Sequence, residues 1–212
     1  MARLDPRRLG VYVLTSDTGP GHREFATAAV KGGATAVQLR APELPDDQLE
    51  PLATSLVEIC GDAGVPLFVN DRVDIAVGSG AAGAHVGQDD DPGSARGRLG
   101  PERILGVSVT SAEEAWVAEM AGADYLGVTV WATATKPGAV AVGLDGLRDI
   151  ARATALPLVG IGGIDARNAR DVLLSGAAGI AVVGAVASAD DPVEAVRELR
   201  ALVDDFYEEK SR

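Results

Sequence analysis

Short apolar runs with the composition of β-strands alternate with helical stretches along the whole chain, and this alternation is the strongest constraint on the fold. Eight runs rich in β-branched residues span residues 11–14, 37–39, 66–69, 84–86, 104–109, 125–130, 158–161 and 180–183. Between them, apolar residues recur at helical intervals, as in residues 49–63, 112–121, 144–154, 166–174 and 192–203. The pattern predicts an α/β fold, a single (β/α)8 TIM barrel at the small end of its size range.

A weak internal repeat supports the same register. Its copies are glycine- and alanine-rich segments at residues 33–37, 80–84, 122–125 and 176–180, and each precedes an even-numbered strand. The first glycine of each copy can adopt the left-handed conformation that ends a helix, and the small residues after it allow a tight turn into the strand. We expect these turns at the end of the barrel opposite the catalytic end.

The composition is that of a globular domain whose core is built from small and branched side chains. Of the 212 residues, 47% are apolar but only 4% are aromatic, as in parallel sheets covered by helices. We expect one domain over residues 1–212, with the barrel at about residues 10–203 and short charged termini.

Charge and hydropathy argue against several classes of partner. The formal net charge is −12, which repels polyanions, so we expect neither nucleic acid nor an anionic membrane as a partner. No run approaches the roughly 18 consecutive apolar residues that span a bilayer. The first ten residues also lack the apolar core of a signal peptide. These features predict a soluble, cytoplasmic protein.

Thiol and imidazole side chains are rare in this chain. Cys60 is the only cysteine, so it cannot form an internal disulfide, and we expect it to pack within a helix. His85 lies inside an apolar strand, which favours packing or support of a neighbouring residue over a role as a base. His22 follows a Gly-Pro-Gly segment in the first loop, and we expect it to be exposed.

In a barrel of this kind, function lies at the carboxyl ends of the strands. The second strand ends in Gln38 and Arg40, and the guanidinium fork of an arginine suits a diphosphate. The third ends in Asn70-Asp71, and Asp90 follows the fourth. Two acids at neighbouring strand ends can share Mg²⁺, which prefers hard oxygen ligands. Two simpler interpretations stay open: Arg40 pairs with a surface acid, and the acids cap the helices that follow.

The later strands are followed by groups that suit a phosphate. Ser108 ends the fifth strand, and the segment Thr133-Ala134-Thr135-Lys136 brings hydroxyls and an ammonium after the sixth. Gly162 and Gly163 follow the seventh strand, and Val183-Gly184 ends the eighth. Bare backbone N–H groups at these ends can bind a phosphate. A purely structural turn explains the glycines equally well.

Six motifs occur in the order found in thiamine-phosphate synthases, and the chain resembles that family over roughly residues 10–200. The motifs are Gln38-Leu39-Arg40, Asn70-Asp71-Arg72-Val73-Asp74, His85-Val86-Gly87-Gln88-Asp89-Asp90, Gly106-Val107-Ser108, Thr133-Ala134-Thr135-Lys136-Pro137 and Ile161-Gly162-Gly163-Ile164. One such motif carries little weight, whereas six in register are specific. The family is also called thiamine-phosphate pyrophosphorylase and is related to thiazole tautomerase.

The resemblance implies a transferase that joins 4-amino-2-methyl-5-hydroxymethylpyrimidine diphosphate to a thiazole phosphate and releases diphosphate, with Mg²⁺ as cofactor. It implies that Asp71 and Asp90 hold the metal. It also gives catalytic roles to Arg40, Ser108 and Lys136. Loss of diphosphate would leave a methylene cation for the thiazole nitrogen to attack, so no protein nucleophile is needed. The residues that the resemblance places at the substrates are Gln38, Leu39, Arg40, Asn70, Ser108, Thr133, Ala134, Thr135, Lys136, Gly162, Gly163, Val183 and Gly184.

The chain departs from the family pattern at three places. Ala41-Pro42 replaces an acid and a lysine, Val128-Thr129 replaces Gly-Pro, and Gly184 replaces a serine. Two alternatives therefore stay open: a thiazole tautomerase, which needs neither diphosphate nor metal, and a noncatalytic binder of thiamine precursors. The two retained acids and the lack of the tautomerase histidine at Thr129 favour the synthase. A homo-oligomer also stays open, because such barrels commonly self-associate.

Overall fold

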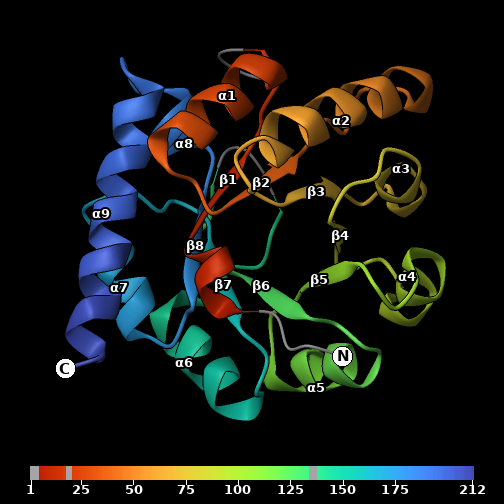
Figure 1. Ribbon diagram of the computed structural model, residues 1–212. Helices are drawn as coiled ribbons and strands as arrows, with labels where there is room; N and C mark the ends of the chain where they lie inside the picture. Colours follow the sequence, from red (N-terminus) through yellow and green to blue (C-terminus); the bar gives the residue numbers. More distant parts are fainter. Residues whose placement is uncertain (1–4, 18–20, 134–137) are drawn as a thin grey trace.

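Eight parallel strands close into a barrel in sequence order, with the first strand paired to the eighth (Figure 1). This computed structural model describes residues 5–17, 21–133 and 138–212. The strands are β1 (Val11–Leu14), β2 (Ala36–Leu39), β3 (Leu67–Asn70), β4 (Gly83–Val86), β5 (Ile104–Ser108), β6 (Tyr125–Thr129), β7 (Leu158–Ile161) and β8 (Gly179–Val182). The (β/α)8 prediction is confirmed, and each strand end either matches the expected one or differs from it by one residue.

Helices surround the barrel on the outside (Figure 1). They are α1 (His22–Gly32), α2 (Asp46–Gly61), α3 (Val73–Gly78), α4 (Pro92–Leu99), α5 (Ala112–Met120), α6 (Gly143–Ala153), α7 (Ala169–Leu174), α8 (Gly184–Ala187) and α9 (Pro192–Lys210). A 3₁₀ helix, η1 (Pro6–Leu9), precedes β1. Helix α9 continues well past residue 203 and packs against α1 and α7, so it closes the ring of helices beside β8.

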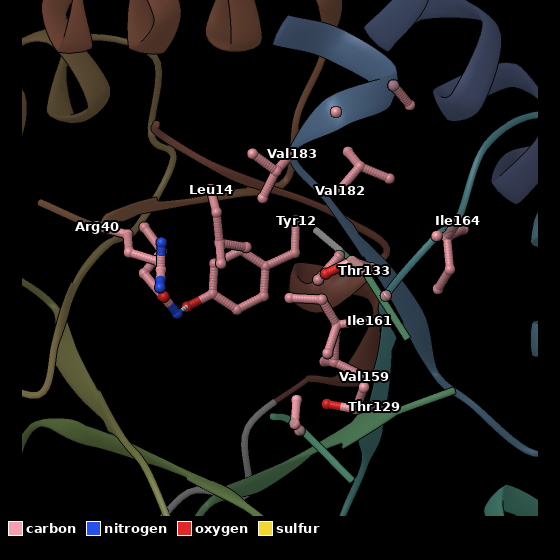
Figure 2. A pocket seen from close by; sticks show the side chains of 18 of the residues that line it. Tyr12, Leu14, Arg40, Thr129, Thr133, Val159, Ile161, Ile164, Val182 and Val183 are labelled. Atoms are coloured by element: carbon pink, nitrogen blue, oxygen red, sulfur yellow. Dashed lines mark hydrogen bonds between the residues drawn. The ribbon is translucent and has the colours of Figure 1, made fainter. Parts of the chain in front are cut away.

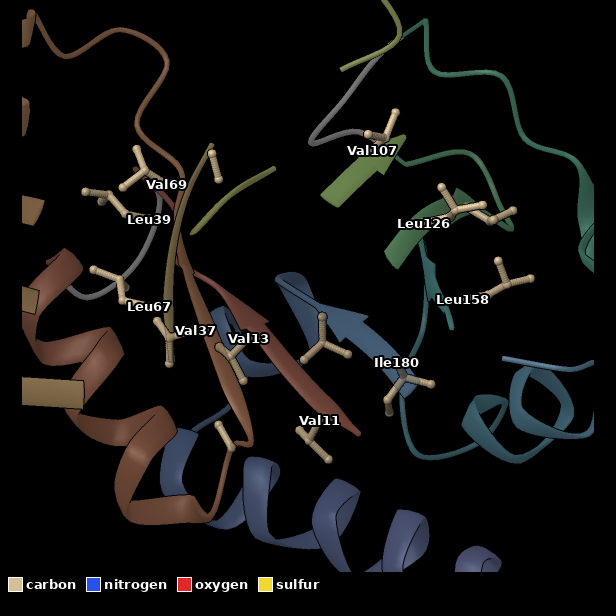
Figure 3. Packing of buried hydrophobic residues seen from close by; sticks show 14 of the residues in the cluster. Val11, Val13, Val37, Leu39, Leu67, Val69, Val107, Leu126, Leu158 and Ile180 are labelled. Carbon is tan, nitrogen blue, oxygen red and sulfur yellow. The ribbon is translucent and has the colours of Figure 1, made fainter. Parts of the chain in front are cut away.

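An outer apolar layer fills the space between the strands and the helices (Figure 3). Val11 and Val13 of β1 belong to it, whereas Tyr12 between them points into the barrel, because successive strand residues face opposite sides of a sheet. Cys60 is buried in the same layer, and burial raises the pKa of its thiol to about 12. The expectation that Cys60 packs within a helix is confirmed.

A second apolar cluster fills the barrel interior. It consists of Leu9, Tyr12, Leu14, Ala36, Phe68, Tyr125, Val159 and Ala181. Leu9 comes from η1, and the rings of Tyr12, Phe68 and Tyr125 pack with centroids 5.4–6.0 Å apart. These three aromatic rings form a solid floor, so any cavity in the barrel lies above them, at the carboxyl ends of the strands.

The repeat glycines have the conformation expected from the sequence. Gly33, Gly80, Gly122 and Gly176 all have positive φ angles, of 92°, 76°, 89° and 106°. A side chain at such a position is strained, because its Cβ would crowd the backbone. The repeat therefore marks turns into even-numbered strands, as the sequence predicts.

None of the helices in the described part of the chain combines the length and the apolar character that crossing a membrane requires.

Candidate active site

A cavity of about 420 Å³ opens at the carboxyl ends of the strands, and every strand of the barrel contributes residues to its wall. Figure 2 shows the ring of Tyr12 between Arg40 on one side and Thr133 on the other. This volume falls within the range of pockets that hold small ligands.

Most of the residues expected at the substrates line this cavity. They are Gln38, Arg40, Asn70, Ser108, Thr133, Gly162, Gly163, Val183 and Gly184. Leu39 is an exception, because its side chain points outward into the layer between the strands and the helices. The two-residue period of a strand places Gln38 inside and Leu39 outside. Ala134, Thr135 and Lys136 lie outside the described residues.

Asp71 and Asp90 lie next to the cavity rather than in its wall, and both reach toward Gly87. A methyl group on Gly87 would lie 3.6 Å from Oδ2 of Asp90 and 3.9 Å from Oδ1 of Asp71. The Gly87 N–H donates to Oδ2 of Asp90 over 3.0 Å, and Nδ2 of Asn70 donates to Oδ2 of Asp71 over 2.6 Å. A cavity residue therefore contacts one of the two acids directly.

The backbone of Asp71 adopts an unusual conformation. Its φ angle of 59° is the only positive one among the described residues other than glycine. Left-handed backbone is costly for most residues but tolerated by Asp and Asn, and it occurs often at functional sites. At the end of β3 this conformation turns the chain so that the Asp71 carboxylate faces the end of β4.

The helix-capping interpretation is wrong for Asp90. Helix α4 is capped by Asp91, whose carboxylate accepts from the N–H groups of Gly93 and Ser94. Helix α3 has no side-chain cap at its first flanking residue, Arg72. Asp90 does not cap α4, because its carboxylate accepts from the Gly87 N–H instead.

The two acids form a donor set that fits Mg²⁺. Among the described residues, no group of three or more His, Cys, Asp or Glu side chains gathers as a complete protein cage for a metal ion. Mg²⁺ needs no such cage, because it is commonly held by one or two carboxylates and completes its shell with water and substrate phosphate oxygens. Two neighbouring carboxylates such as those of Asp71 and Asp90 offer the hard oxygen donors that this chemistry requires.

Arg40 lies at the cavity wall, and no carboxylate of the described residues pairs with its guanidinium. It takes part in none of the ion pairs found among the described residues. The interpretation of Arg40 as half of a surface ion pair is therefore wrong. A half-buried cation at the wall of a pocket attracts anionic ligands, and its planar fork suits phosphate oxygens.

The position of His22 corrects the sequence-based expectation. Its side chain is only 15% exposed, because α1 begins at this residue and directs the ring toward the barrel mouth. Nδ1 lies 2.9 Å from Oγ1 of Thr15, and Nε2 lies 3.1 Å from Oδ1 of Asp17. Oγ1 of Thr15 also accepts from the Arg40 N–H over 3.1 Å. His22 thus supports the loop that carries Arg40.

A continuous chain of hydrogen bonds crosses the floor of the cavity. Nε2 of Gln38 donates to the Tyr12 hydroxyl over 3.0 Å, and that hydroxyl lies 2.9 Å from the hydroxyl of Tyr125. The Tyr125 hydroxyl lies 3.0 Å from Nδ1 of His85, whose Nε2 lies 3.0 Å from Oγ of Ser108. Burial raises the pKa of both tyrosines, so both phenols stay protonated.

The sequence did not single out Tyr12 or Tyr125 as site residues. Both lie in apolar strand runs, where an aromatic residue is usually part of the core. Only the alternation of inward and outward positions along β1 and β6 could have indicated that they face the barrel interior. His85 meets the expectation of a supporting residue, since its ring contacts Ser108 and Tyr125.

The opposite side of the cavity is formed by backbone. Gly162 and Gly163 have φ angles of 98° and 63°, and a side chain on Gly162 would lie 2.3 Å from the Trp131 carbonyl oxygen. Nδ2 of Asn168 donates to the Gly163 carbonyl over 2.9 Å and braces this turn. Val183 and Gly184 line the same side, at the start of α8. The first N–H groups of a helix lack partners within it and suit phosphate oxygens.

The departures from the family pattern have different places in the structure. Val128 is fully buried in the outer layer, whereas Thr129 lines the cavity. The carbonyl of Pro42 accepts from a guanidinium N–H of Arg72 over 3.2 Å. Of these positions, Thr129 and Gly184 reach the cavity wall directly.

Comparisons with known proteins agree on one family. The family model described as thiamine monophosphate synthase matches residues 11–186. The thiamine-phosphate synthase of Chloroflexus aurantiacus is 50% identical over 198 residues, which cover 91% of this chain and 92% of that protein. The thiamine-phosphate synthase of Moorella thermoacetica is 47% identical over 90% of this chain and 93% of that protein.

A solved structure shows the same similarity in three dimensions. The thiamine phosphate pyrophosphorylase of Pyrococcus furiosus superposes with a TM-score of 0.88 at 38% sequence identity, and the match covers 94% of this chain and 98% of that one. A 3-hexulose-6-phosphate synthase matches with a TM-score of 0.69 at only 21% identity, which shows a shared barrel fold alone.

Proposed function

The chain belongs to the thiamine monophosphate synthase family, and we propose that it joins 4-amino-2-methyl-5-hydroxymethylpyrimidine diphosphate to a thiazole phosphate, giving thiamine phosphate and diphosphate. The observation that carries this proposal is a single cavity with an anion-binding group at each side. Arg40 lies on one side, at the end of β2, and the backbone of Gly162, Gly163 and Gly184 lies on the other. Two phosphorylated substrates need two such groups around one reaction centre.

The pyrimidine diphosphate fits the side of the cavity formed by β2 and β3. We assign Arg40 and Asn70 to the diphosphate, and Gln38 and Ser108 to the pyrimidine ring. Lys136, assigned to the same diphosphate from the sequence, lies outside the described residues. The thiazole phosphate fits the opposite side, against the N–H groups of the Gly162-Gly163 turn and the start of α8, with Thr133 at its edge.

Mg²⁺ is part of this proposal, with Asp71 and Asp90 as its protein ligands. When bound there, the ion neutralises the negative charge of the departing diphosphate. Asn70 supports this assignment, because its amide lies in the cavity wall and donates to the Asp71 carboxylate. The same side chain can therefore hold the acid in place and contact the substrate.

The residues of the chain contribute mainly charge and position. When the bond between the methylene carbon and the diphosphate oxygen breaks, the electron pair leaves with the oxygen, and the guanidinium of Arg40 stabilises the charge that develops there. The thiazole nitrogen then donates its lone pair to the methylene carbon. Leu14, Val159, Ile161 and Ala181 form apolar parts of the wall and keep water from the electron-poor carbon. No protein nucleophile is required.

The first experiment measures thiamine phosphate formed by the purified protein from both substrates, with Mg²⁺ and again after adding a chelator. The proposal expects product with Mg²⁺ and a large loss with the chelator. Product formation unaffected by the chelator would remove the metal from the proposal. Folded protein that binds the thiazole phosphate but makes no product would favour the two alternatives, a thiazole tautomerase or a noncatalytic binder. An assay of thiazole isomerisation then distinguishes these two functions.

The proposal includes small-molecule partners only and a cytoplasmic location. The net charge of −12 supports the first part, since it disfavours binding to polyanions. Self-association stays a prediction, which light scattering of the purified protein measures directly.

A further inference from the structure

We propose that Tyr12, Tyr125 and His85 are positioning residues that couple the Gln38 amide to the Ser108 hydroxyl, so that the cavity offers a hydrogen-bond acceptor at Gln38 and a donor at Ser108. The five side chains form one unbroken chain across the floor of the cavity. The identity of the ligand that bonds to Gln38 and Ser108 rests on the proposed function. The donor-to-acceptor direction of the hydrogen bonds is a property of the protein itself.

Counting hydrogens fixes that direction. The Tyr12 hydroxyl accepts from Nε2 of Gln38, and the acceptor that the printed contacts leave for its single hydrogen is the Tyr125 oxygen. The Tyr125 hydroxyl accepts this bond and donates its own hydrogen to Nδ1 of His85. The neutral imidazole then carries its hydrogen on Nε2 and donates to Oγ of Ser108. The hydroxyl hydrogen of Ser108 is left for a ligand in the cavity.

With a neutral His85, the two ends of the hydrogen-bond chain change together. If the Gln38 amide were turned over, Oε1 would accept from Tyr12, every bond would reverse, and Ser108 would donate to His85. The cavity would then offer a donor at Gln38 and an acceptor at Ser108. A doubly protonated His85 does not fit the first arrangement, because it would donate at both nitrogens and leave the Tyr12 hydroxyl hydrogen without an acceptor among these five side chains.

The surrounding structure is shaped to admit this chain. A Cβ on Gly106 would lie 2.2 Å from Cζ of Tyr125 and 2.4 Å from Nδ1 of His85, where their hydrogen bond runs. A Cβ on Gly127 would lie 2.8 Å from Cε1 of His85. Both glycines occupy inward positions of β5 and β6, which larger side chains would normally fill. Because glycine has no side chain, the imidazole of His85 has room to contact both Tyr125 and Ser108.

The hydrogen-bond chain is buried at its Gln38 end, so the direction of its bonds affects which ligand can bind. Gln38 is 2% exposed, and its Oε1 is shielded from water with no hydrogen-bond partner among the described residues. A buried acceptor without a partner favours a ligand that brings an N–H donor. The exocyclic amino group of a 4-aminopyrimidine is such a donor, and a ring nitrogen can accept from Ser108. A 4-oxo pyrimidine would place an oxygen against Oε1 and force the whole chain to reverse.

The direction can be measured without any enzyme assay. The protein has only two histidines, His22 and His85. ¹⁵N NMR of the histidine-labelled His22→Gln variant therefore reports on His85 alone. The proposal expects a neutral ring with the hydrogen on Nε2 and an unprotonated Nδ1. A ring with its hydrogen on Nδ1 would mean that the chain runs in the opposite direction, and this result would overturn the proposal.

The coupling is tested with Tyr12→Phe and Tyr125→Phe, which remove one hydroxyl each and keep the packed ring. In each variant, we expect the preference for the 4-amino over the 4-oxo pyrimidine diphosphate to fall about tenfold. This factor corresponds to the free energy of one oriented hydrogen bond. The KM for the thiazole phosphate should stay unchanged. Tyr207→Phe is the matched control, because its hydroxyl donates to the Ala178 carbonyl away from the cavity.

Unchanged selectivity in folded Tyr12→Phe and Tyr125→Phe would overturn the coupling. Equal rises in KM for both substrates would also overturn it, since they indicate a general structural defect. If the wild-type protein makes no thiamine phosphate, calorimetric binding of the 4-amino and 4-oxo pyrimidine diphosphates to the same variants still measures the preference. Failure of the coupling and failure of the proposed function are thereby separated.

Discussion

Asp71 and Asp90 lie 19 positions apart in the chain, yet one carboxylate oxygen of each lies within 4 Å of the position that a Cβ on Gly87 would occupy. They come from the ends of the neighbouring strands β3 and β4, which pair in parallel. Gly87 leaves space between the carboxylates, and the left-handed backbone of Asp71 directs its side chain into that space. Mutual repulsion of two such carboxylates is relieved by a cation between them.

This relationship leads to the first prediction, for Asp71→Asn and Asp90→Asn. Each change removes one charged ligand but keeps the shape of the side chain, and asparagine tolerates the positive φ at position 71. We expect turnover to fall by about 100-fold, comparable to removing one main electrostatic contact from an active site. The assay is thiamine phosphate formation over a range of Mg²⁺ concentrations.

Asp89→Asn is the matched control for these variants, because Asp89 is exposed and adjacent to Asp90. It should retain nearly full activity. Equal activity of all three variants would show that the acid pair does not hold a catalytic metal.

Arg40→Lys and Arg40→Gln test the role of the guanidinium. Lysine keeps the charge but loses the planar fork that bonds two phosphate oxygens at once. We expect Arg40→Lys to lower kcat/KM for the pyrimidine diphosphate by about tenfold, and Arg40→Gln by about 100-fold. Steady-state kinetics with the pyrimidine diphosphate varied provides the measurement. Arg40→Lys that matched the wild type would leave only the charge, not the fork, as the contribution of this residue.

Gly106→Ala should destabilise the fold, because its new methyl group would overlap the Tyr125 ring and Nδ1 of His85. Forcing extra atoms into a packed core typically costs about 1–3 kcal/mol. Gly97→Ala is the control: this exposed glycine lies inside α4 with open space around it, so alanine there should stabilise by up to about 1 kcal/mol. Urea denaturation of both variants measures the difference. A Gly106→Ala protein as stable as the wild type would contradict the close packing around His85.

The Arg96–Asp124 pair is expected to stabilise the fold more than the surface ion pairs do. Arg96 and Asp124 are only 17% and 21% exposed, and their side chains meet at 2.6 Å. Asp124 also accepts from the Leu105 N–H over 2.8 Å, so this pair ties α4 to the starts of β5 and β6. Arg96→Met should lower the free energy of unfolding by about 2–3 kcal/mol, because it leaves a partly buried carboxylate without its cation.

The control for this prediction is Arg152→Met, which breaks the exposed i,i+3 pair with Asp149. Such surface pairs contribute about 0.5 kcal/mol or less. Chemical denaturation should rank Arg96→Met well below Arg152→Met in stability, and equal losses would contradict the structural role of the inner pair.

Cys60 should make the stability of the protein fall at alkaline pH. Burial raises the pKa of its thiol from 9.0 to about 12 in the folded state. Folding therefore favours the protonated form: the stabilising contribution is complete below pH 9.0 and is lost as the pH rises toward 12. Denaturation between pH 7 and 10.5 should show this decline, with a smaller slope in Cys60→Ala. Alkylation of Cys60 in the native protein at pH 8 as fast as in the unfolded chain would contradict its burial.

Local features of the sequence were sufficient for the architecture. Apolar runs of strand length, helical spacing between them and the glycine repeat before even-numbered strands are all encoded within a few residues of one another. They predicted the barrel and its strand bounds closely. The barrel rule then placed Gln38, Arg40 and Ser108 at one rim. The outward position of Leu39 also followed from strand alternation, although the motif that contains it suggested a contact with substrate.

Only the tertiary structure decided which side chains meet. The hydroxyls of Tyr12 and Tyr125 are 113 positions apart and touch because the barrel closes and its strands are staggered. His22 is held at the mouth by Thr15 and Asp17, which no local pattern indicated. The sequence by itself determined the strands, the helices and the chemistry available at the rim, because hydrophobic periodicity and turn residues act locally. The tertiary structure decided the acid pair at Gly87 and the hydrogen-bonded chain below the cavity, because both depend on distances that only the closed barrel sets.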